Sequence, residues 1–383
     1  MRKRAFAVFL VMASAFPVIS TDLYLPALPA ITAYFNTAER LTNVTLICFS
    51  ITLAVSMLIW GPLSDKYGRK PVTILAGIFY LSGSLMCAFS QSITQLICFR
   101  IIQAIGCGAA MMVATAFVKD VYEEERQEGI LSLVQGMVLI CPAIAPSIGA
   151  LVLHLMNWQG TFFIQAIMGV IIFAGGLLIK ETLKEPLQAG IAKTLGRLLV
   201  VCRNKRFVIL LLIFSIPALP NMAFINASPY IFQSHFGLSS QIYALFFGTS
   251  AISMMAGTFC YLPASKRVGR SAIVYLCYSI LPLSGVGILL FGSLSPFAMI
   301  AMILPSSFIC LMVKPLGTFL MLNAQESDTG SVSSLIGFGG LLFNTVGMLL
   351  LPLFPNYFAA VGALYLVFGI FALVLFFAFV RKV

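Results

Sequence analysis

Three charged residues lie inside long apolar stretches of this sequence, and their types and positions are suited to binding protons or polar ligands. Asp22 stands near the end of an apolar run that begins at Ala5, Arg100 lies in "ITQLICFRIIQAIG", and Lys314 lies in "FICLMVKPLGTF". An ionised side chain inside hydrocarbon costs about 3 kcal/mol or more, so such residues are usually functional. The chemistry that they indicate is ion or proton binding within a membrane.

Asp22 follows Ala5 by about 17 residues, so on a helix that rises ~1.5 Å per residue it lies ~25 Å along the run. A carboxylate in a partly apolar cavity can take up one proton, and its affinity for cations changes when it does. Protonation and substrate binding would then compete, as an exchanger requires. The alternative is an interfacial acid that caps the helix at the headgroups, with Pro26 and Pro29 ending the span.

Arg100 and Lys314 each allow two interpretations. Gln103, on the turn after Arg100, favours a polar helix face around a buried guanidinium, whereas a long basic side chain near a helix end can also extend outward to the headgroups. Lys314 lies deep in its apolar run. It either places positive charge in a cavity, which favours neutral, zwitterionic or anionic ligands, or buries its stem and reaches the cytoplasm with its amine.

These residues must be positioned by membrane-spanning helices. The chain has 383 residues, of which 60% are hydrophobic and only 9% are charged, whereas a soluble domain has about 25% charged residues. Apolar runs of ~20 residues recur with short polar breaks between them. The predicted spans are 5–24, 44–63, 72–89, 95–117, 130–153, 161–180, 207–227, 241–261, 272–291, 296–321, 332–354 and 359–380. The sequence therefore predicts an all-α membrane protein with twelve transmembrane helices and leaves no room for a soluble catalytic domain.

The formal net charge of +11 follows the membrane and does not indicate nucleic-acid binding. With the N-terminus in the cytoplasm, nearly all Lys and Arg residues of the loops and termini fall on the cytoplasmic side, and only Arg40 falls on the opposite side of the membrane. Both termini are therefore expected in the cytoplasm. A signal peptide cleaved after "ASA" at 13–15 would leave eleven spans and break this alternation.

The remaining chemistry-bearing residue types carry no pattern of their own. The nine cysteines are scattered without a CxxC spacing, and both histidines, His154 and His235, fall in predicted outer loops. We expect no disulfide, no metal site and no cofactor. We also expect no intramembrane enzyme, because no predicted span contains His and the one Asp within a span has no matching acid.

An internal repeat divides the spans into two sets of six. "GPLSDKYGRK" follows the second span and "LPASKRVGRS" follows the eighth, and four residues recur at a constant offset: Pro62, Ser64, Gly68 and Arg69 match Pro263, Ser265, Gly269 and Arg270. The sequence predicts an N-terminal bundle over 1–180, a cytoplasmic linker over 181–206 and a C-terminal bundle over 207–383. Repeats of this kind place a substrate site between the two halves near the membrane midplane.

Five stretches carry a family resemblance. "GPLSDKYGRKP" (61–71) resembles the loop signature of the major facilitator superfamily, and "RIIQAIGCGAA" (100–110) resembles the fourth-helix signature of its proton-coupled exporters. "GMVLICPAIAPSIGA" (136–150) is similar to the antiporter motif, although Cys141 and Ala150 stand where glycine is usual. "TDLYLPALPAI" (21–31) and "FINASPYIFQSHFGLSSQIYALFFG" (224–248) resemble the branch of bicyclomycin and chloramphenicol resistance transporters.

The resemblance implies roles for individual residues. It assigns proton coupling to Asp22 and Arg100. It implies a conformational latch that favours the outward-open state, made by Gly61, Asp65, Gly68, Arg69 and Asp120; the alternative is an ordinary solvated loop. It implies a hinge or seal at Gly136, Pro142, Pro146 and Gly149, which plain helix packing would also explain. The predicted substrate cavity comprises Tyr24, Gln103, Asn221, Asn226, Tyr230 and Lys314.

From these features we expect a twelve-helix facilitator, monomeric in the bacterial inner membrane, that interacts with the lipid bilayer, protons and small-molecule substrates. It would export small amphiphilic drugs, such as bicyclomycin- or chloramphenicol-like compounds, in exchange for protons. The alternative is a dedicated exporter of an anionic or zwitterionic metabolite or metal chelator, which Lys314 motivates.

Overall fold

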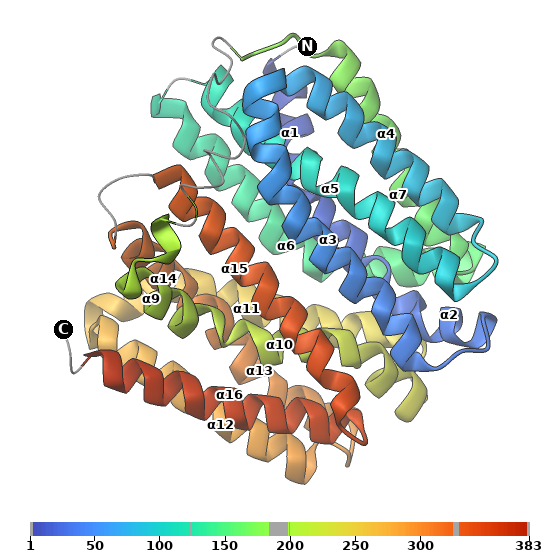
Figure 1. Ribbon diagram of the computed structural model, residues 1–383. Helices are drawn as coiled ribbons and strands as arrows, with labels where there is room; N and C mark the ends of the chain where they lie inside the picture. Colours follow the sequence, from blue (N-terminus) through green and yellow to red (C-terminus); the bar gives the residue numbers. More distant parts are fainter. Residues whose placement is uncertain (1–2, 123, 184–197, 199, 325–328, 381–383) are drawn as a thin grey trace. The chain divides into compact units, whose positions relative to one another are not determined.

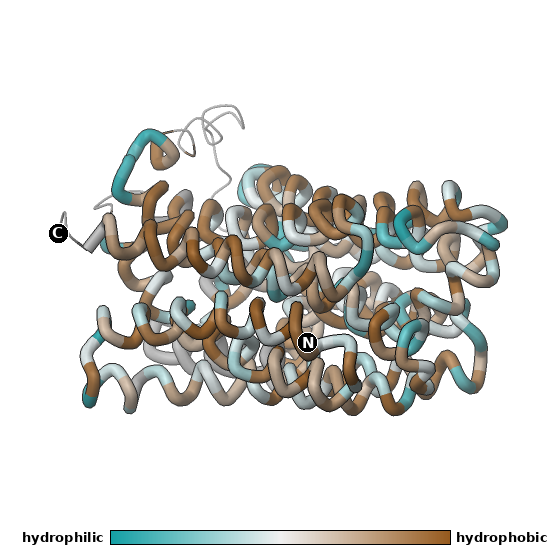
Figure 2. The backbone as a smooth tube through the Cα atoms, turned by 90° about the horizontal axis from the view of Figure 1, so that it is seen from below, coloured by the Kyte–Doolittle hydropathy of each residue, from teal (hydrophilic) through white to brown (hydrophobic). Residues whose placement is uncertain are grey.

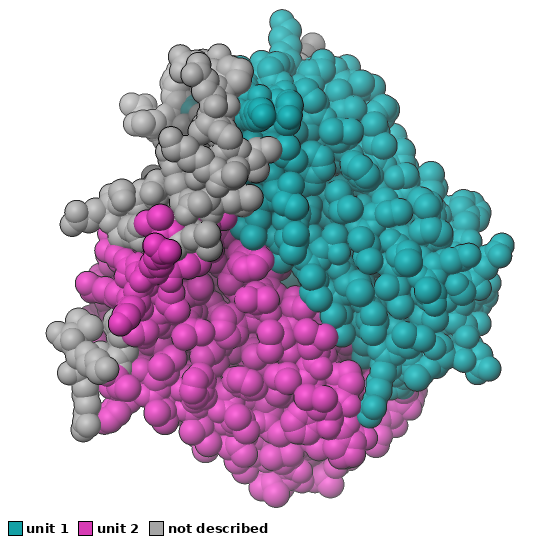
Figure 3. Space-filling model, in the orientation of Figure 1, with its two compact units in different colours: residues 1–194 teal, residues 195–383 magenta. Residues whose placement is uncertain are grey.

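The computed structural model describes residues 3–122, 124–183, 198, 200–324 and 329–380, and over these residues every regular element is helical. The chain divides into two compact units, Met1–Thr194 and Leu195–Val383 (Figure 3). The division falls within the segment 181–206, the longest polar break in the sequence.

The first unit is built from seven α-helices and one short 3₁₀ turn over its described residues (Figure 1). They are α1 (Lys3–Asp22), η1 (Leu25–Ala27), α2 (Leu28–Tyr34), α3 (Glu39–Tyr67), α4 (Arg69–Ala88), α5 (Ile93–Val121), α6 (Glu124–Met156) and α7 (Gln159–Leu178). Helix α4 packs against both α5 and α7, α3 packs on α5, and α1 packs on α5 and α6. This packing brings the ends of α3, α4, α5 and α7 together.

The second unit repeats the pattern with more interruptions. Its elements are α9 (Lys205–Ser215), α10 (Ala218–Pro229), the π-helical η2 (Tyr230–His235), α11 (Ser240–Val268), α12 (Arg270–Phe291), α13 (Pro296–Met312), α14 (Lys314–Leu322), α15 (Thr329–Leu350), η3 (Leu351–Leu353) and α16 (Tyr357–Val380). Helix α12 packs on α16, α11 on α13, and α10 on α15, matching the α4·α7, α3·α5 and α1·α6 pairs of the first unit.

Eleven helical segments among the described residues are long and apolar enough to cross a membrane, and Ile140–Met156 of α6 forms a shorter apolar segment. Figure 2 shows apolar residues along much of the length of these helices. The predicted all-α, twelve-helix membrane fold is thus confirmed. The first predicted span, 5–24, is wrong in its end point, because the apolar helical segment runs over Val8–Tyr34.

Proline breaks the first segment without ending it. Pro26 has no N–H to donate to the carbonyl of Asp22, four residues earlier, so α1 stops at Asp22. The chain turns through Leu23 and Tyr24 and then resumes helical structure in η1 and α2 as far as Tyr34. The interpretation in which Pro26 and Pro29 end the span is therefore wrong.

Each unit has a glycine packed directly on the break in its first segment. A Cβ at Gly149 of α6 would collide with the backbone carbonyl of Leu23, and a Cβ at Gly347 of α15 would collide with that of Leu219. Leu219 lies just after the gap between α9 and α10, at Ile216 and Pro217. Small residues let helix backbones approach this closely. The two units therefore share a broken helix held against a glycine.

Candidate functional site

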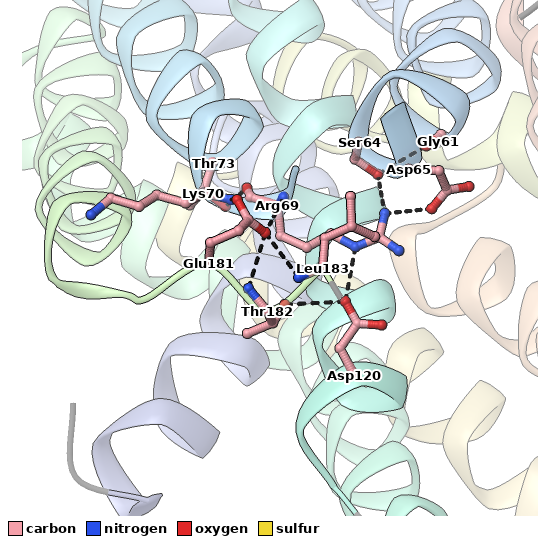
Figure 4. Close-up of polar contacts among 10 residues, drawn as sticks. All are labelled: Gly61, Ser64, Asp65, Arg69, Lys70, Thr73, Asp120, Glu181, Thr182 and Leu183. Atoms are coloured by element: carbon pink, nitrogen blue, oxygen red, sulfur yellow. Dashed lines mark hydrogen bonds and ion pairs between the residues drawn. The ribbon is translucent and has the colours of Figure 1, made fainter. Parts of the chain in front are cut away.

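Arg69 is the centre of an ion-pair cluster where α3, α4 and α5 meet (Figure 4). Its Nη1 lies 2.5 Å from Oδ1 of Asp65, and its Nε donates to Oδ2 of Asp120 at 2.9 Å. The same Nη1 donates to Oγ of Ser64 at 2.6 Å. The guanidinium is largely buried, with 8% of its side chain exposed, whereas Asp65 is 42% exposed. The structure thus brings together the predicted latch residues Asp65, Arg69 and Asp120.

Gly68 makes the turn that aims Arg69 into this cluster. Its φ of 101° lies in the region that favours glycine, and it separates the end of α3 from the start of α4. The Gly61 carbonyl accepts from Ser64 Oγ at 2.9 Å, so the Ser64 oxygen is left as an acceptor for Arg69 Nη1. Gly61 and Gly68 therefore contribute through backbone geometry.

Glu181, just after α7, completes the cluster from a third direction (Figure 4). One of its oxygens accepts from the backbone N–H of Arg69 at 2.8 Å and the other from that of Lys70 at 3.1 Å. Partial burial of the carboxylate opposes its ionisation. Hydrogen bonds from the backbone N–H groups of Leu183, Arg69, Lys70 and Thr182 outweigh this effect, so the pKa of Glu181 lies below its ordinary value.

The equivalent loop of the second unit carries no such cluster among the described residues. Gly269 has the same backbone conformation, with φ 88°, but Lys266 stands where Asp65 stands in the first loop. Arg270 is exposed and lies 5.4 Å from the centre of the Phe319 ring. The repeat therefore preserves the turn and not the ion pairs.

Asp22 is 7% exposed and terminates α1 at the proline break. The structure gives its carboxylate no ion pair among the described residues. Gly149 of α6 packs on the carbonyl of Leu23, the residue that follows Asp22. A carboxylate held here, inside the Val8–Tyr34 segment, can exchange a proton without separating from a cationic partner.

Arg100 is fully buried inside the first unit, so the alternative in which it extends to the headgroups is excluded. Its guanidinium carbon lies 4.1 Å from the centre of the Phe49 ring and 4.7 Å from that of Tyr24. Cation–π contacts of this kind stabilise a desolvated charge by about 2 kcal/mol. Nη1 donates to Gln103 Oε1 at 2.7 Å, and Nε and Nη2 have no hydrogen-bond partner among the described residues.

A chain of amides and hydroxyls extends from Arg100. Gln103 Nε2 donates to Ser84 Oγ at 2.7 Å and to Gln165 Oε1 at 2.6 Å, and the Ser20 hydroxyl is hydrogen-bonded to that of Tyr80. This network lies between α1, α4, α5 and α7. Gln165 Nε2 donates to the Ser20 carbonyl at 3.4 Å, so the network connects Ser20, two residues before Asp22, to Arg100.

Two residues predicted to line the substrate cavity belong instead to this buried network. Tyr24 and Gln103 have no exposed surface. Tyr24 packs on Arg100, and its hydroxyl is hydrogen-bonded to Thr45 at 2.9 Å. Because their polar groups are satisfied inside the helix bundle, both residues support Arg100 and do not present a surface to a ligand.

The three predicted cavity residues of α10 and η2 are also buried, in the second unit. Asn221 accepts from the Tyr365 hydroxyl at 3.3 Å. Both amide atoms of Asn226 are buried without a hydrogen-bond partner among the described residues. Tyr230 stacks on Tyr357, with ring centres 5.4 Å apart.

Lys314 begins α14, directly after a break at Val313, and is exposed. Pro315 removes the N–H that would bond to the Leu311 carbonyl, which explains the break. The residue lies within the apolar segment Pro296–Leu322, well away from either end. An exposed amine at this depth is more compatible with an aqueous or ligand-facing environment than with lipid.

The residues of the antiporter motif lie along α6. Pro142 and Pro146 are inside the helix, and Gly149 contacts the Leu23 carbonyl, next to Asp22. Gly136 falls in the part of α6, residues 124–139, whose side chains lie outside the described residues. The motif therefore packs on the break that holds Asp22.

The sequence analysis missed Glu181, Thr182, Gln165 and the Ser20–Tyr80 pair. For Gln165, Ser20 and Tyr80 the only signal was a polar residue within a predicted span. Glu181 is the first residue of the polar segment after a span, a position from which an acid can reach a neighbouring helix N-terminus. No group of three or more His, Cys, Asp or Glu suited to a metal ion occurs among the described residues.

The repeated broken helices, the intramembrane charges and the ion-pair loop define a two-unit membrane transporter fold. The chain belongs to the Major Facilitator Superfamily, whose profile matches residues 6–343. Structures of a mutant peptide transporter in complex with alafosfalin and of a D-xylose-proton symporter share this fold. The peptide transporter has a TM-score of 0.75 at 14% identity, over 98% of this chain and 98% of its own. The symporter has a TM-score of 0.71 at 14% identity, over 96% of this chain and 97% of its own.

Curated relatives show greater sequence similarity. Multidrug resistance protein MdtL from Salmonella typhimurium is 31% identical over 239 residues, which cover 61% of this chain and 60% of the relative. The MdtL proteins from Salmonella paratyphi A and Salmonella newport match over the same lengths, at 32% and 31% identity. The match thus spans about three fifths of each relative. The fold and these similarities are those of transporters and not of enzymes.

Proposed function

We propose that the chain exports small amphiphilic drugs, such as bicyclomycin- or chloramphenicol-like compounds, in exchange for protons. The relatives named multidrug resistance proteins support drug export. The observation that carries proton exchange is Asp22, a buried carboxylate without an ion-pair partner among the described residues, at a helix break inside a membrane-spanning segment.

In this mechanism Asp22 releases its proton when substrate binds and takes up another after substrate leaves. Arg100, held by aromatic rings and the amide of Gln103, keeps a buried positive charge against Tyr24, two residues after Asp22. Inward movement of each proton supplies ~2.3 kcal/mol per 100 mV and ~1.4 kcal/mol per pH unit. The chain would lie in a bacterial inner membrane with both termini on the cytoplasmic side, and it would act as a monomer.

The test is efflux of chloramphenicol and of bicyclomycin from proteoliposomes under an imposed pH gradient. We expect export that follows the gradient and stops when a protonophore collapses it. Equal flux with and without the gradient would contradict proton exchange, and no flux of either compound would contradict the proposed substrates.

A second candidate is export of an anionic or zwitterionic metabolite or metal chelator, which the exposed Lys314 favours. Lys314→Met removes the positive charge and keeps the length of the side chain. If Lys314 contacts substrate, resistance profiles of overproducing cells should shift away from anionic and toward cationic compounds. An unchanged profile at equal protein level would mean that Lys314 contacts no substrate.

A further inference from the structure

The Glu181 carboxylate has an unusual place in the first unit, because it contacts the start of a helix that precedes it by more than a hundred residues. Its Oε1 accepts from the N–H groups of Arg69, Thr182 and Leu183 at 2.8, 3.0 and 3.0 Å, and its Oε2 accepts from that of Lys70 at 3.1 Å. The first N–H groups of a helix have no partner within it. Glu181 therefore caps α4 from the chain that follows α7.

A second contact ties the same segment to the ion-pair cluster. The Thr182 hydroxyl donates to Oδ2 of Asp120 at 3.1 Å, and that oxygen also accepts from Arg69 Nε. One carboxylate oxygen of Asp120 thus receives hydrogen bonds from α4 and from the segment after α7. Any movement of this segment would change the position of Asp120 relative to Arg69.

The loop between α3 and α4 is shaped to admit Glu181. A Cβ at Gly68 would collide with the Glu181 carboxylate, whereas a Cβ at Gly269, the equivalent of Gly68 in the second unit, would meet nothing within 4 Å. Both glycines have positive φ, so backbone conformation alone requires glycine at each. Only the first loop has the additional requirement of space for a carboxylate.

We propose that Glu181 is a positioning residue of the latch: it fixes the start of α4 so that Arg69 can pair with Asp65 and Asp120 together, and thereby couples the chain after α7 to the conformational balance. The predicted effect of Glu181 on the transport cycle rests on the transporter function proposed above. The capping contacts themselves can be tested without any substrate.

The first measurement is hydrogen–deuterium exchange of the full-length protein in lipid nanodiscs. In Glu181→Ala the amides of Arg69 and Lys70 lose their acceptors, so exchange at 69–73 should become at least about tenfold faster. In Glu181→Gln the retained oxygen can keep the bonds that Oε1 accepts, so a smaller increase is expected. The start of α12, residues 270–274, should be unchanged, and Lys180→Gln, a charge change at the exposed neighbouring residue, should leave 69–73 unchanged.

The second measurement asks whether Glu181 acts through the Arg69 cluster. Thermal stability is measured for Glu181→Gln, Asp120→Asn and the double variant. If Glu181 positions Arg69 for Asp120, the two losses of Tm should be clearly less than additive in the double variant. Additive losses, or unchanged exchange at 69–73 in Glu181→Ala, would overturn the proposal.

The third measurement uses gradient-driven chloramphenicol efflux. A positioning residue remote from substrate should lower the turnover of Glu181→Ala and leave KM unchanged, and Glu181→Gln should recover part of the turnover. A raised KM with normal turnover would contradict the assignment. If the wild type does not transport chloramphenicol but the exchange and stability results hold, the proposed substrate fails and the role of Glu181 in the cluster stands.

Discussion

At the scale of single residues, the charges inside the first unit have different surroundings, which suit different tasks. Arg100 is enclosed by rings and an amide, and its position is fixed by packing. Asp22 ends a helix at a break and has no ion pair among the described residues. A fixed cation and an unpaired carboxylate are the combination that we expect where a proton is taken up and released.

Asp22→Asn should abolish gradient-driven drug efflux, because the amide keeps the size and some hydrogen bonding of the side chain but cannot titrate. Substrate binding should survive and lose its pH dependence, since asparagine resembles the protonated acid in being neutral. The measurement is efflux from proteoliposomes under a pH gradient, with wild type and variant reconstituted at equal density. Full efflux by the variant would mean that Asp22 is not the essential proton carrier.

Acid sensitivity provides a separate test of Glu181. Because its folded pKa lies below the ordinary value, ionised Glu181 stabilises the fold above its unfolded pKa, and this stabilisation is lost as the pH falls through the folded pKa. The Tm difference between wild type and Glu181→Gln should therefore be constant from about pH 8 to about pH 6 and shrink below about pH 4.5. A difference that grows on acidification would contradict the direction of the shift.

At the scale of helices, each unit depends on a glycine that lies against a break in its first segment. Gly149 contacts the Leu23 carbonyl and Gly347 the Leu219 carbonyl. These breaks arise from prolines, which leave carbonyl groups without helical partners. The glycine helices α6 and α15 thus hold the parts of the fold where the backbone departs from regular helix.

Gly347→Ala should destabilise the protein by about 1–3 kcal/mol, because the added methyl group has no space against backbone. Gly340→Ala is the matched control on α15, since a Cβ there meets nothing within 4 Å and alanine favours helix. Thermal unfolding in nanodiscs should show a lower Tm for the first variant and an equal or higher Tm for the control. Equal Tm values for both would show that the packing at Gly347 is not tight.

At the scale of the whole molecule, the two units share topology and differ in charge. The first loop has Asp65 and Arg69, with Asp120 from α5 and Glu181 from the segment after α7. The second loop has the glycine turn and an exposed Arg270. An ion-pair cluster on one unit can stabilise one conformation of a transport cycle over another. Two identical clusters, one on each unit, would discriminate less between the conformations.

Asp65→Asn should slow turnover and leave substrate affinity unchanged, because the ion pair biases conformations without touching a ligand. We expect a several-fold lower maximal efflux rate with the same KM, measured in proteoliposomes under a fixed pH gradient. The matched control is Lys266→Asn in the equivalent loop of the second unit, which should leave the rate unchanged. Weaker substrate binding with an unaltered conformational balance would count against the latch.

The sequence by itself determined the class of this protein. Apolar runs, the distribution of Lys and Arg and the repeated "GPLSDKYGRK" and "LPASKRVGRS" loops are local features, and the helical membrane fold followed from them. The latch residues followed from the resemblance of 61–71 to a family loop signature. Asp65 and Arg69 are four residues apart in the sequence, on either side of the Gly68 turn, so their proximity was expected from the sequence.

The tertiary structure alone decided which distant side chains meet. Tyr24 and Gln103 were assigned to a cavity because they are polar residues in spans, but the packing of α1, α4, α5 and α7 encloses them around Arg100. Glu181 lies 112 residues from Arg69 in the chain and contacts it only because α4 and α7 pack side by side. Local hydropathy reports which residues avoid water, whereas the register between packed helices, set by glycine contacts and proline breaks, determines their partners.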